Sequence, residues 1–393
     1  MRPDPLDYLS SELQALRDQG LYRRLRVLDE EQKARTSIDH RLVVNLSSNN
    51  YLGLTTHPAL RERAIEATRR LGVGSGSVRT IAGTMEIHME LERRLAAFKR
   101  TEAAVVFQSG FTANAGTVAS LLGRDDVIVS DELNHASIID GARLSRATIK
   151  VFPHRDAAAA RGILAALPRG PRTLLITDGV FSMDGDLGAL PALCDLAEEF
   201  GCIMMVDDAH ASGVFGEHGR GTVDHFGLHG RVDIQVGTLS KAIGVLGGYV
   251  AGSRALIEFL YHRARPFLFS TSHPPAVAAA CLAALDVLES EPQLIARLWE
   301  NTRFFKAGLA ALGFDTGASE SPITPVMVGD AALAMRLSDR LFERGVFAQG
   351  IGFPTVPRGK ARVRTIVTAA HTREQLELAL DGFRAAGTEL GVI

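Results

Sequence analysis

The stretch VGTLSKAIGVLGG, residues 236–248, places a single lysine, Lys241, among small, apolar and hydroxyl-bearing residues without a carboxylate. Short apolar runs lie on both sides of it and recur upstream. They are AAVVF (103–107), DVIVS (126–130), TIKVF (148–152), TLLIT (173–177), CIMMV (202–206), DIQVG (233–237) and GGYVAG (247–252). Runs of this length that alternate with helical stretches are typical of strands buried on both faces of a parallel sheet. The pattern predicts an α/β fold with a mainly parallel sheet.

The length and composition favour more than one domain. The chain has 393 residues and 46% hydrophobic content, enough for a large core. We expect an N-terminal helical segment (1–45), a large domain (46–274) and a smaller α+β domain (275–393). The 43 basic and 45 acidic residues nearly cancel, which argues against a nucleic-acid or membrane-surface partner.

The remaining bulk features favour a cytoplasmic protein. The N-terminus is polar and lacks an apolar signal core, and no uncharged apolar run is long enough to span a bilayer. The three cysteines, Cys194, Cys202 and Cys281, lack metal-site spacing and leave one thiol unpaired in any disulfide scheme. We expect reduced, buried thiols and no metal site.

Polar residues follow five of the apolar runs at the point where each strand should end. The tails are found in VVFQSGF, VIVSDELNHAS, LLITDGVFSMDGD, MMVDDAH and VGTLSK. Because ligands of open α/β sheets bind beyond the carboxyl ends of the strands, we expect these tails to meet in one pocket.

Two of the tails suggest specific chemistry. The first is VGTLSK, which carries Lys241. A lysine that is removed from water has a lowered pKa and can form a Schiff base with a carbonyl. The alternative is a surface lysine, which is the usual position of a single lysine. Asp207, Asp208 and His210 follow the strand at 202–206, where they could be solvated carboxylates or metal ligands, although no third ligand stands at motif spacing. A third interpretation is an aspartate on a pyridinium N–H beside a histidine on a phenolic oxygen, as pyridoxal 5'-phosphate (PLP) requires.

The other tails agree with the third interpretation. Ser109, Gly110 and Phe111 stand at a strand-to-helix turn whose backbone N–H groups could bind phosphate. His135 offers an aromatic plane for a pyridine ring, or is an ordinary structural histidine, and Ser182 offers a hydrogen-bond donor. The glycine-rich GVGSGSV (72–78) follows a helix rather than a strand, which argues against a dinucleotide fold.

The combination of SSNNYLGL, SVRTIAGT, SDELNHASIIDG, TDGVFSMDGD, VDDAH, GTLSKAIG, RPFLFSTS and ARVRTIVTAAHT resembles the α-oxoamine synthases from about residue 10 to the C-terminus. These are PLP enzymes of fold type I, with the aspartate aminotransferase fold. The resemblance implies a large domain with a mainly parallel seven-stranded sheet and a smaller α+β C-terminal domain.

Two branches of this family are similar to different parts of the chain. SVRTIAGT and HASIIDGARL are similar to the glycine C-acetyltransferases of threonine breakdown, which condense glycine with acetyl-CoA, and this is our first expectation. FSTSHPPA and PTVPRGKARVR are similar to the 8-amino-7-oxononanoate synthases of biotin synthesis, which join L-alanine to a pimeloyl thioester of CoA or a carrier protein with loss of CO2. This activity, or both together, is the alternative. A PLP aminotransferase or lyase, or a non-catalytic PLP-binding protein, is the alternative from a different class.

The resemblance also implies roles for individual residues. Lys241 would carry PLP covalently and act as general base, His135 would stack on the ring and donate a proton, and Asp207 would pair with the ring nitrogen. The further cofactor-binding residues would be Ser109, Gly110, Phe111, Ser182, His210, Thr238, Ser240, Ser270 and Thr271. The last two match positions supplied by the partner subunit, which implies a homodimer with a shared active site. Arg364 would grip the amino-acid carboxylate, and Asn50, Arg23 and Thr355 would lie on the substrate side.

Overall fold

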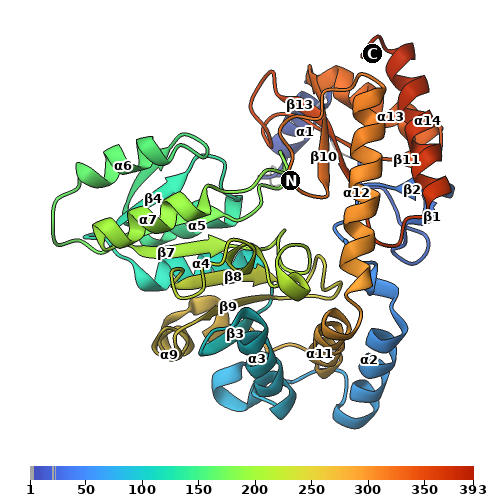
Figure 1. Cartoon of the computed structure of the whole chain (residues 1–393). Helices are drawn as coiled ribbons and strands as arrows, with labels where there is room; N and C mark the ends of the chain where they lie inside the picture. The colour runs from blue at the N-terminus through green and yellow to red at the C-terminus, as the bar shows by residue number, and fades with distance from the viewer. Residues whose placement is uncertain (1–3, 20–21, 23) are drawn as a thin grey trace.

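The seven apolar runs form one sheet at the centre of the molecule (Figure 1). The computed structural model describes residues 4–19, 22 and 24–393. The strands, in their order across the sheet, are β3 (Ala103–Phe107), β9 (Gly248–Gly252), β8 (Ile234–Thr238), β7 (Ile203–Asp207), β6 (Thr173–Asp178), β4 (Val127–Asp131) and β5 (Thr148–Phe152). Strand β9 is antiparallel to both of its neighbours, and the other strands run parallel. The expected mainly parallel, seven-stranded α/β fold is therefore confirmed.

Helices cover both faces of this sheet, which explains why its central strands are apolar throughout. Successive side chains of a strand point to opposite faces, so Val105 packs in one core cluster and Val106 in another. One face is covered by α4 (Gly110–Leu121), α5 (Ala136–Ser145), α9 (Arg254–Arg263) and α10 (Arg265–Leu268). The other is covered by α6 (Ala157–Ala165), α7 (Leu190–Phe200), α8 (Thr222–His225), α3 (Glu86–Lys99) and α11 (Pro275–Ser290), with α2 (Pro58–Leu71) packed against α11.

The smaller C-terminal domain holds two short sheets (Figure 1). One is antiparallel, in the order β10 (Ile323–Gly329), β13 (Ala361–Ile366), β12 (Gln349–Ile351). The other joins β1 (Arg35–Ile38) and β2 (Arg41–Asn45) to β11 (Val346–Phe347). Three helices pack around a shared apolar core: α12 (Gln293–Ala311), α13 (Ala331–Glu343) and α14 (Arg373–Glu389). The division at 45 and 274 stays a prediction, and the pairing of β2 with β11 attaches residues 35–45 to the C-terminal domain.

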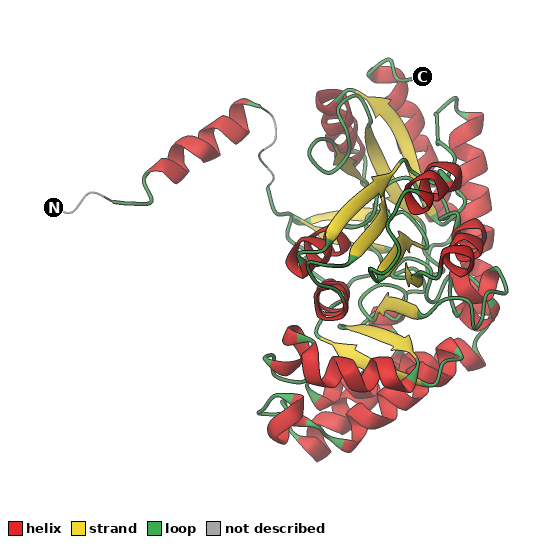
Figure 2. Cartoon of the chain, turned by 90° about the vertical axis from the view of Figure 1, so that its left-hand side faces the viewer, coloured by secondary structure: helices red, strands yellow, loops and turns green. Residues whose placement is uncertain are grey.

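Helix α1 (Tyr8–Asp18) extends away from the rest of the chain (Figure 2). None of its residues is buried, and Tyr8, Leu9, Leu13 and Leu16 are exposed. Among the described residues, no helix is both long and apolar enough to cross a membrane.

Candidate active site

The carboxyl ends of three adjacent strands bring the acidic and basic groups together. Asp178 at the end of β6 and Asp207 at the end of β7 are register partners, and Thr238 ends the neighbouring β8. Asp207 is buried and accepts hydrogen bonds from Asn114 Nδ2 at 2.6 Å and from Ala209 N at 2.8 Å. Burial and the nearby Asp207 raise the pKa of Asp178 well above its ordinary value. This end of the sheet therefore holds a carboxylate fixed by donors beside a carboxyl group whose protonated form is favoured by burial and by the neighbouring Asp207.

The adjacent Asp208 faces the other way and serves the structure. Its carboxylate forms a buried ion pair with Lys99 Nζ at 2.8 Å and accepts hydrogen bonds from Thr222. Consecutive residues of a strand point to opposite sides, so Asp207 and Asp208 cannot both face Lys241.

Lys241 lies just beyond β8 and is partly buried. Within the described part of the chain, Lys241 Nζ makes no hydrogen bond or ion pair. Burial lowers its pKa to about 8 against the opposing effect of Asp207 and Asp178, and Arg364 lowers it further. An amine with such a pKa is partly unprotonated near neutral pH and can act as a nucleophile or a base.

The N-terminus of α4 forms an anion-binding corner against Thr238. The Ser109 hydroxyl caps the helix by accepting from Thr112 N at 3.1 Å, while Gly110 N and Phe111 N have no backbone acceptor among the described residues. A Cβ at Gly110 would come within 3.3 Å of Thr238 Cβ. Thr238 Oγ1 in turn lies 2.8 Å from the hydroxyl of the exposed Ser240. Free amides and hydroxyls at a helix N-terminus suit a phosphate group.

His210 is a buried, neutral histidine held by a tyrosine. Its Nδ1 lies 2.8 Å from Tyr51 Oη. Burial, together with Lys241 and Arg364, lowers the pKa of His210 well below its ordinary value, and burial raises that of Tyr51. A neutral His210 therefore shares one hydrogen bond with Tyr51 through Nδ1, which leaves its Nε2 for a ligand.

His135 presents its ring to the same region. Its backbone N–H donates to Asp178 Oδ2 at 2.9 Å, and its Nδ1 accepts from Ser137 N at 3.2 Å. The side chain is exposed, and burial of part of the ring lowers its pKa against the influence of Asp207, with Lys241 lowering it further.

Arg364 extends from β13 of the C-terminal domain to the large domain. Its Nη1 donates to the carbonyl oxygen of Ser182 at 3.0 Å. It lines a cavity of about 520 Å³, whose other walls include Ser47, Met183, Phe347, Ile351 and Thr355. The structure thus brings Thr355 into the same cavity as Arg364.

Asn50, a predicted substrate residue, lies at a turn beside this cavity. Asn50 is buried, and its side chain holds the local turn, with Nδ2 donating to Thr55 Oγ1 at 2.6 Å. It lines a cavity of about 300 Å³ that shares Gln32 and Ser48 with the cavity of Arg364, although Arg364 itself is not among its walls. Arg23 lies outside the described residues.

Ser270 and Thr271 lie next to the end of β3. Gln108 Nε2 donates to the Thr271 carbonyl at 2.8 Å, and the Thr271 side chain is exposed. Their contribution to a partner's site stays a prediction.

Three neighbours of the predicted residues were not expected to belong to the site: Tyr51, Asn114 and Asp178. Tyr51 and Asp178 stand inside motifs quoted above, and Asn114 lies three residues beyond VVFQSGF. The partner of each is far away in the chain, as with Asn114 and Asp207. Position within or next to a motif was the signal that could have found them.

Comparisons with known proteins agree with this geometry. The model of the class I and II aminotransferase family matches residues 41–383. The chain is 63% identical to the 8-amino-7-oxononanoate synthase of Symbiobacterium thermophilum over 98% of this chain and 99% of that one. It is 54% identical to 8-amino-7-oxononanoate synthase 1 of Bacillus subtilis over 98% and 99%.

Solved structures give the same picture. A serine palmitoyltransferase of S. paucimobilis with a bound PLP–myriocin aldimine matches with a TM-score of 0.94 at 33% identity, over 99% of this chain and 100% of that one. The 8-amino-7-oxononanoate synthase of Francisella tularensis matches with a TM-score of 0.76 at 29% identity, over 89% and 99%.

The chain belongs to the class I and II aminotransferase family, whose members with this fold use PLP. Within that family it is an α-oxoamine synthase, an enzyme of the acyltransferase type. The first expectation, glycine C-acetyltransferase, is not supported, because the relatives described above at 54–63% identity carry the name of the alternative.

Proposed function

We propose that this chain is an 8-amino-7-oxononanoate synthase. It would join L-alanine to a pimeloyl thioester and release 8-amino-7-oxononanoate, the free thiol and CO2. The 63% identity over nearly the whole of both chains carries this proposal. The candidate site supports it with an unpartnered lysine, a fixed carboxylate and an arginine beside one cavity.

The described residues fit PLP. Lys241 would bind the aldehyde, Asp207 would keep the ring nitrogen protonated, and Gly110, Phe111, Thr238 and Ser240 would hold the phosphate. His210 would donate from Nε2 to the ring oxygen, His135 would stack on the ring, and the Ser182 hydroxyl would contact the ring oxygen as well. When bound, PLP supplies an electron sink for the bond to the substrate α-carbon.

The protein's own groups would then move the protons. Lys241, with its pKa lowered to about 8, is suited to take the α-proton of alanine and to return one later. His135 would donate a hydrogen bond to the oxygen of the attacked thioester carbonyl.

The cavity beside Arg364 would hold the substrates. The planar guanidinium suits the two oxygens of an amino-acid carboxylate. A cavity of about 520 Å³ is many times the volume of a water molecule, roughly 30 Å³, so it accommodates a chain of several methylenes. Its apolar walls, from Met183, Phe347 and Ile351, favour the pimeloyl chain over an acetyl group. Thr355 would contact that acyl chain, and Asn50 would shape the substrate-side turn.

The assembly follows from the same proposal. We infer a homodimer in which Ser270 and Thr271 of each subunit complete the partner's phosphate site. The exposure of the Thr271 side chain supports this arrangement.

A direct competition of substrates tests the proposed activity. The purified holoenzyme is assayed for thiol release with L-alanine plus pimeloyl-CoA, and with glycine plus acetyl-CoA. We expect kcat/KM to favour the first pair at least tenfold. A preference for glycine and acetyl-CoA would return the assignment to glycine C-acetyltransferase, and 2-oxo acid formation without thiol release would indicate an aminotransferase.

A further inference from the structure

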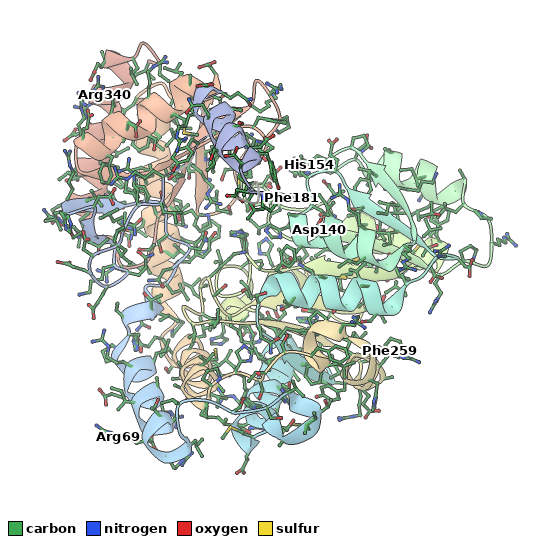
Figure 3. The ribbon with its side chains drawn as sticks, turned by 180° about the vertical axis from the view of Figure 1, so that it is seen from behind. Arg69, Asp140, His154, Phe181, Phe259 and Arg340 are labelled. Carbon is green, nitrogen blue, oxygen red and sulfur yellow. The ribbon has the colours of Figure 1, made fainter. Side chains whose placement is uncertain are left out.

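A charged histidine outside the candidate site connects two of its loops. His154, which follows β5, lies beside Phe181, with their ring centroids 4.3 Å apart in an edge arrangement (Figure 3). Its Nδ1 lies 3.1 Å from Asp131 Oδ1, and its Nε2 lies 2.8 Å from Asp186 Oδ2. Asp131 and Asp186 are buried and His154 is largely so.

The two contacts require a doubly protonated ring. A neutral imidazole has one N–H donor, whereas both nitrogens of His154 face carboxylate oxygens, which only accept. Three other charged groups lie here. Arg155 Nη1 lies 3.4 Å from Asp186 Oδ2, Glu132 accepts from the His154 backbone N–H, and Glu320 pairs with Arg155 at 3.6 Å and accepts from Leu187 N at 3.0 Å. The side-chain hydrogen bonds from Asp131 and Asp186 offset the burial of the ring and raise the pKa of His154 to about 9.

The contact of His154 with Asp131 holds the loop that carries His135. Asp131 is the last residue of β4, and its carboxylate also accepts from Leu133 N at 2.9 Å and Arg155 N at 2.9 Å. His154 therefore connects the start of the 131–135 loop to the segment after β5.

The contact of His154 with Asp186 holds the loop that carries Ser182. Residues 181–187 form a tight loop in which Phe181 N donates to the Asp186 carbonyl at 3.0 Å. Asp186 Oδ1 is buried without a partner among the described residues, so His154 and Arg155 provide the contacts that fix this carboxylate. The same loop offers the Ser182 carbonyl to Arg364.

We propose that His154 is a positioning residue for the amino-acid substrate: it fixes the 181–187 loop, so that the Ser182 carbonyl holds Arg364 in the orientation that receives the carboxylate. This inference rests on the proposed function through the role of Arg364. The His154 side chain touches neither Arg364 nor the cavity that Arg364 lines, and its influence on Arg364 passes through Asp186, Phe181 and the 181–187 loop.

The experiment compares three single variants with the wild-type holoenzyme. His154→Gln removes the charge and one donor, and Asp186→Asn weakens the link from the loop side. His229→Gln is the matched control, because His229 Nε2 bonds to Asp224 at 2.9 Å in the same large domain but outside the site. The affinity for L-alanine is measured by titration of the cofactor absorbance, and KM and kcat are measured with the pimeloyl thioester.

Both test variants should raise the dissociation constant and KM for L-alanine about tenfold, since small misplacements of a binding group are costly. They should leave kcat and the thioester KM within about threefold. A double variant that combines His154→Gln with Asp186→Asn should bind L-alanine no more weakly than the worse of the two single variants. His229→Gln should leave all of these values unchanged. If His154→Gln does not fold, Asp186→Asn alone carries the test.

The inference is overturned if the folded variants bind L-alanine as tightly as His229→Gln does. It is also overturned if the losses of L-alanine affinity in His154→Gln and Asp186→Asn add in the double variant. A wild-type enzyme without turnover on L-alanine would contradict the proposed function instead, while the absorbance titration with glycine would still report on His154.

Discussion

At the scale of single residues, Lys241 can be tested against a second lysine of similar acidity. Borohydride reduction of the holoenzyme followed by peptide mapping should place the cofactor on Lys241. Lys306 also has a pKa lowered to about 8 by burial, but its Nζ donates to Ser319 and Ser321 oxygens. Lys241→Ala should abolish labelling and turnover, and Lys306→Ala should retain both. A label on any other residue would contradict the proposed role of Lys241.

His154 gives the protein a dependence of stability on pH. The pKa of His154 in the folded protein is about 9, above the ordinary value of 6.5. Its contribution to the free energy of unfolding is therefore complete below pH 6.5 and is lost as the pH rises through 9. This pKa shift corresponds to a contribution to the free energy of unfolding on the order of 3 kcal/mol at low pH. Chemical unfolding from pH 6 to pH 10 should show this loss, and the loss should be smaller in His154→Gln. Equal slopes in the two proteins would contradict the assignment.

Arg364 can be tested by a change that keeps its charge. Arg364→Lys removes the planar pair of donors but retains a cation, so KM for L-alanine should rise about tenfold or more with a smaller effect on the thioester KM. Steady-state kinetics with each substrate varied in turn measures this. An unchanged alanine KM would show that Arg364 does not hold the carboxylate.

The sequence predicted the polar residues that stand at strand ends, but not those that support them. Lys241 and Asp207 follow apolar runs, so their position at one edge of the sheet could be anticipated. Asn114 and His154 contact carboxylates that are 93 and 32 positions away in the chain, respectively. Such contacts depend on how the helices and loops pack over the sheet, which no local pattern encodes.

At the scale of elements, the N-terminus of α4 should control cofactor affinity. Gly110→Ala places a Cβ 3.3 Å from Thr238 Cβ, which is tighter than an ordinary contact, so Thr238 or the helix end has to shift at the anion-binding corner. We expect PLP to bind the apoenzyme about tenfold more weakly, as overpacking of this kind costs about 1–3 kcal/mol. Gly162→Ala is the control, because its Cβ would meet no atom within 4 Å. Fluorescence titration of both apoproteins with PLP measures the difference.

The direction of one strand shows what the element pattern omits. The run GGYVAG resembles the other buried runs, yet β9 is antiparallel to β8. A parallel return needs a crossover of a dozen or more residues, and only residues 239–247 separate the two strands. Apolar runs therefore predict which segments enter the sheet, whereas the length of the connections decides their direction.

At the scale of the whole molecule, exposed apolar side chains favour the proposed dimer. Ile81 and Phe269 are 82% and 69% exposed, and α1 carries four further exposed apolar residues. The segments of these two residues lie together, because Val78 pairs with Thr271, and exposed apolar groups that gather in one patch mark sites of association. Light scattering should give twice the mass of one chain, and Ile81→Asp should shift the protein toward the monomer and weaken PLP binding. Leu144→Asp, at another exposed apolar position, should do neither, and a monomeric wild type would contradict the shared site.

Arg362 and Arg364 alternate along β13, and both extend to the 182–184 segment of the large domain. The same C-terminal domain supplies Phe347, Ile351 and Thr355 to the cavity wall, while the lysine and its aspartate come from the central sheet. Evolution can therefore change the C-terminal part of the wall that would meet the thioester, next to Met183 and residues 24–48, and leave the vitamin B6 chemistry of the central sheet intact. Grafting residues 346–360 between relatives with different acyl preferences would reproduce that evolutionary step in the laboratory.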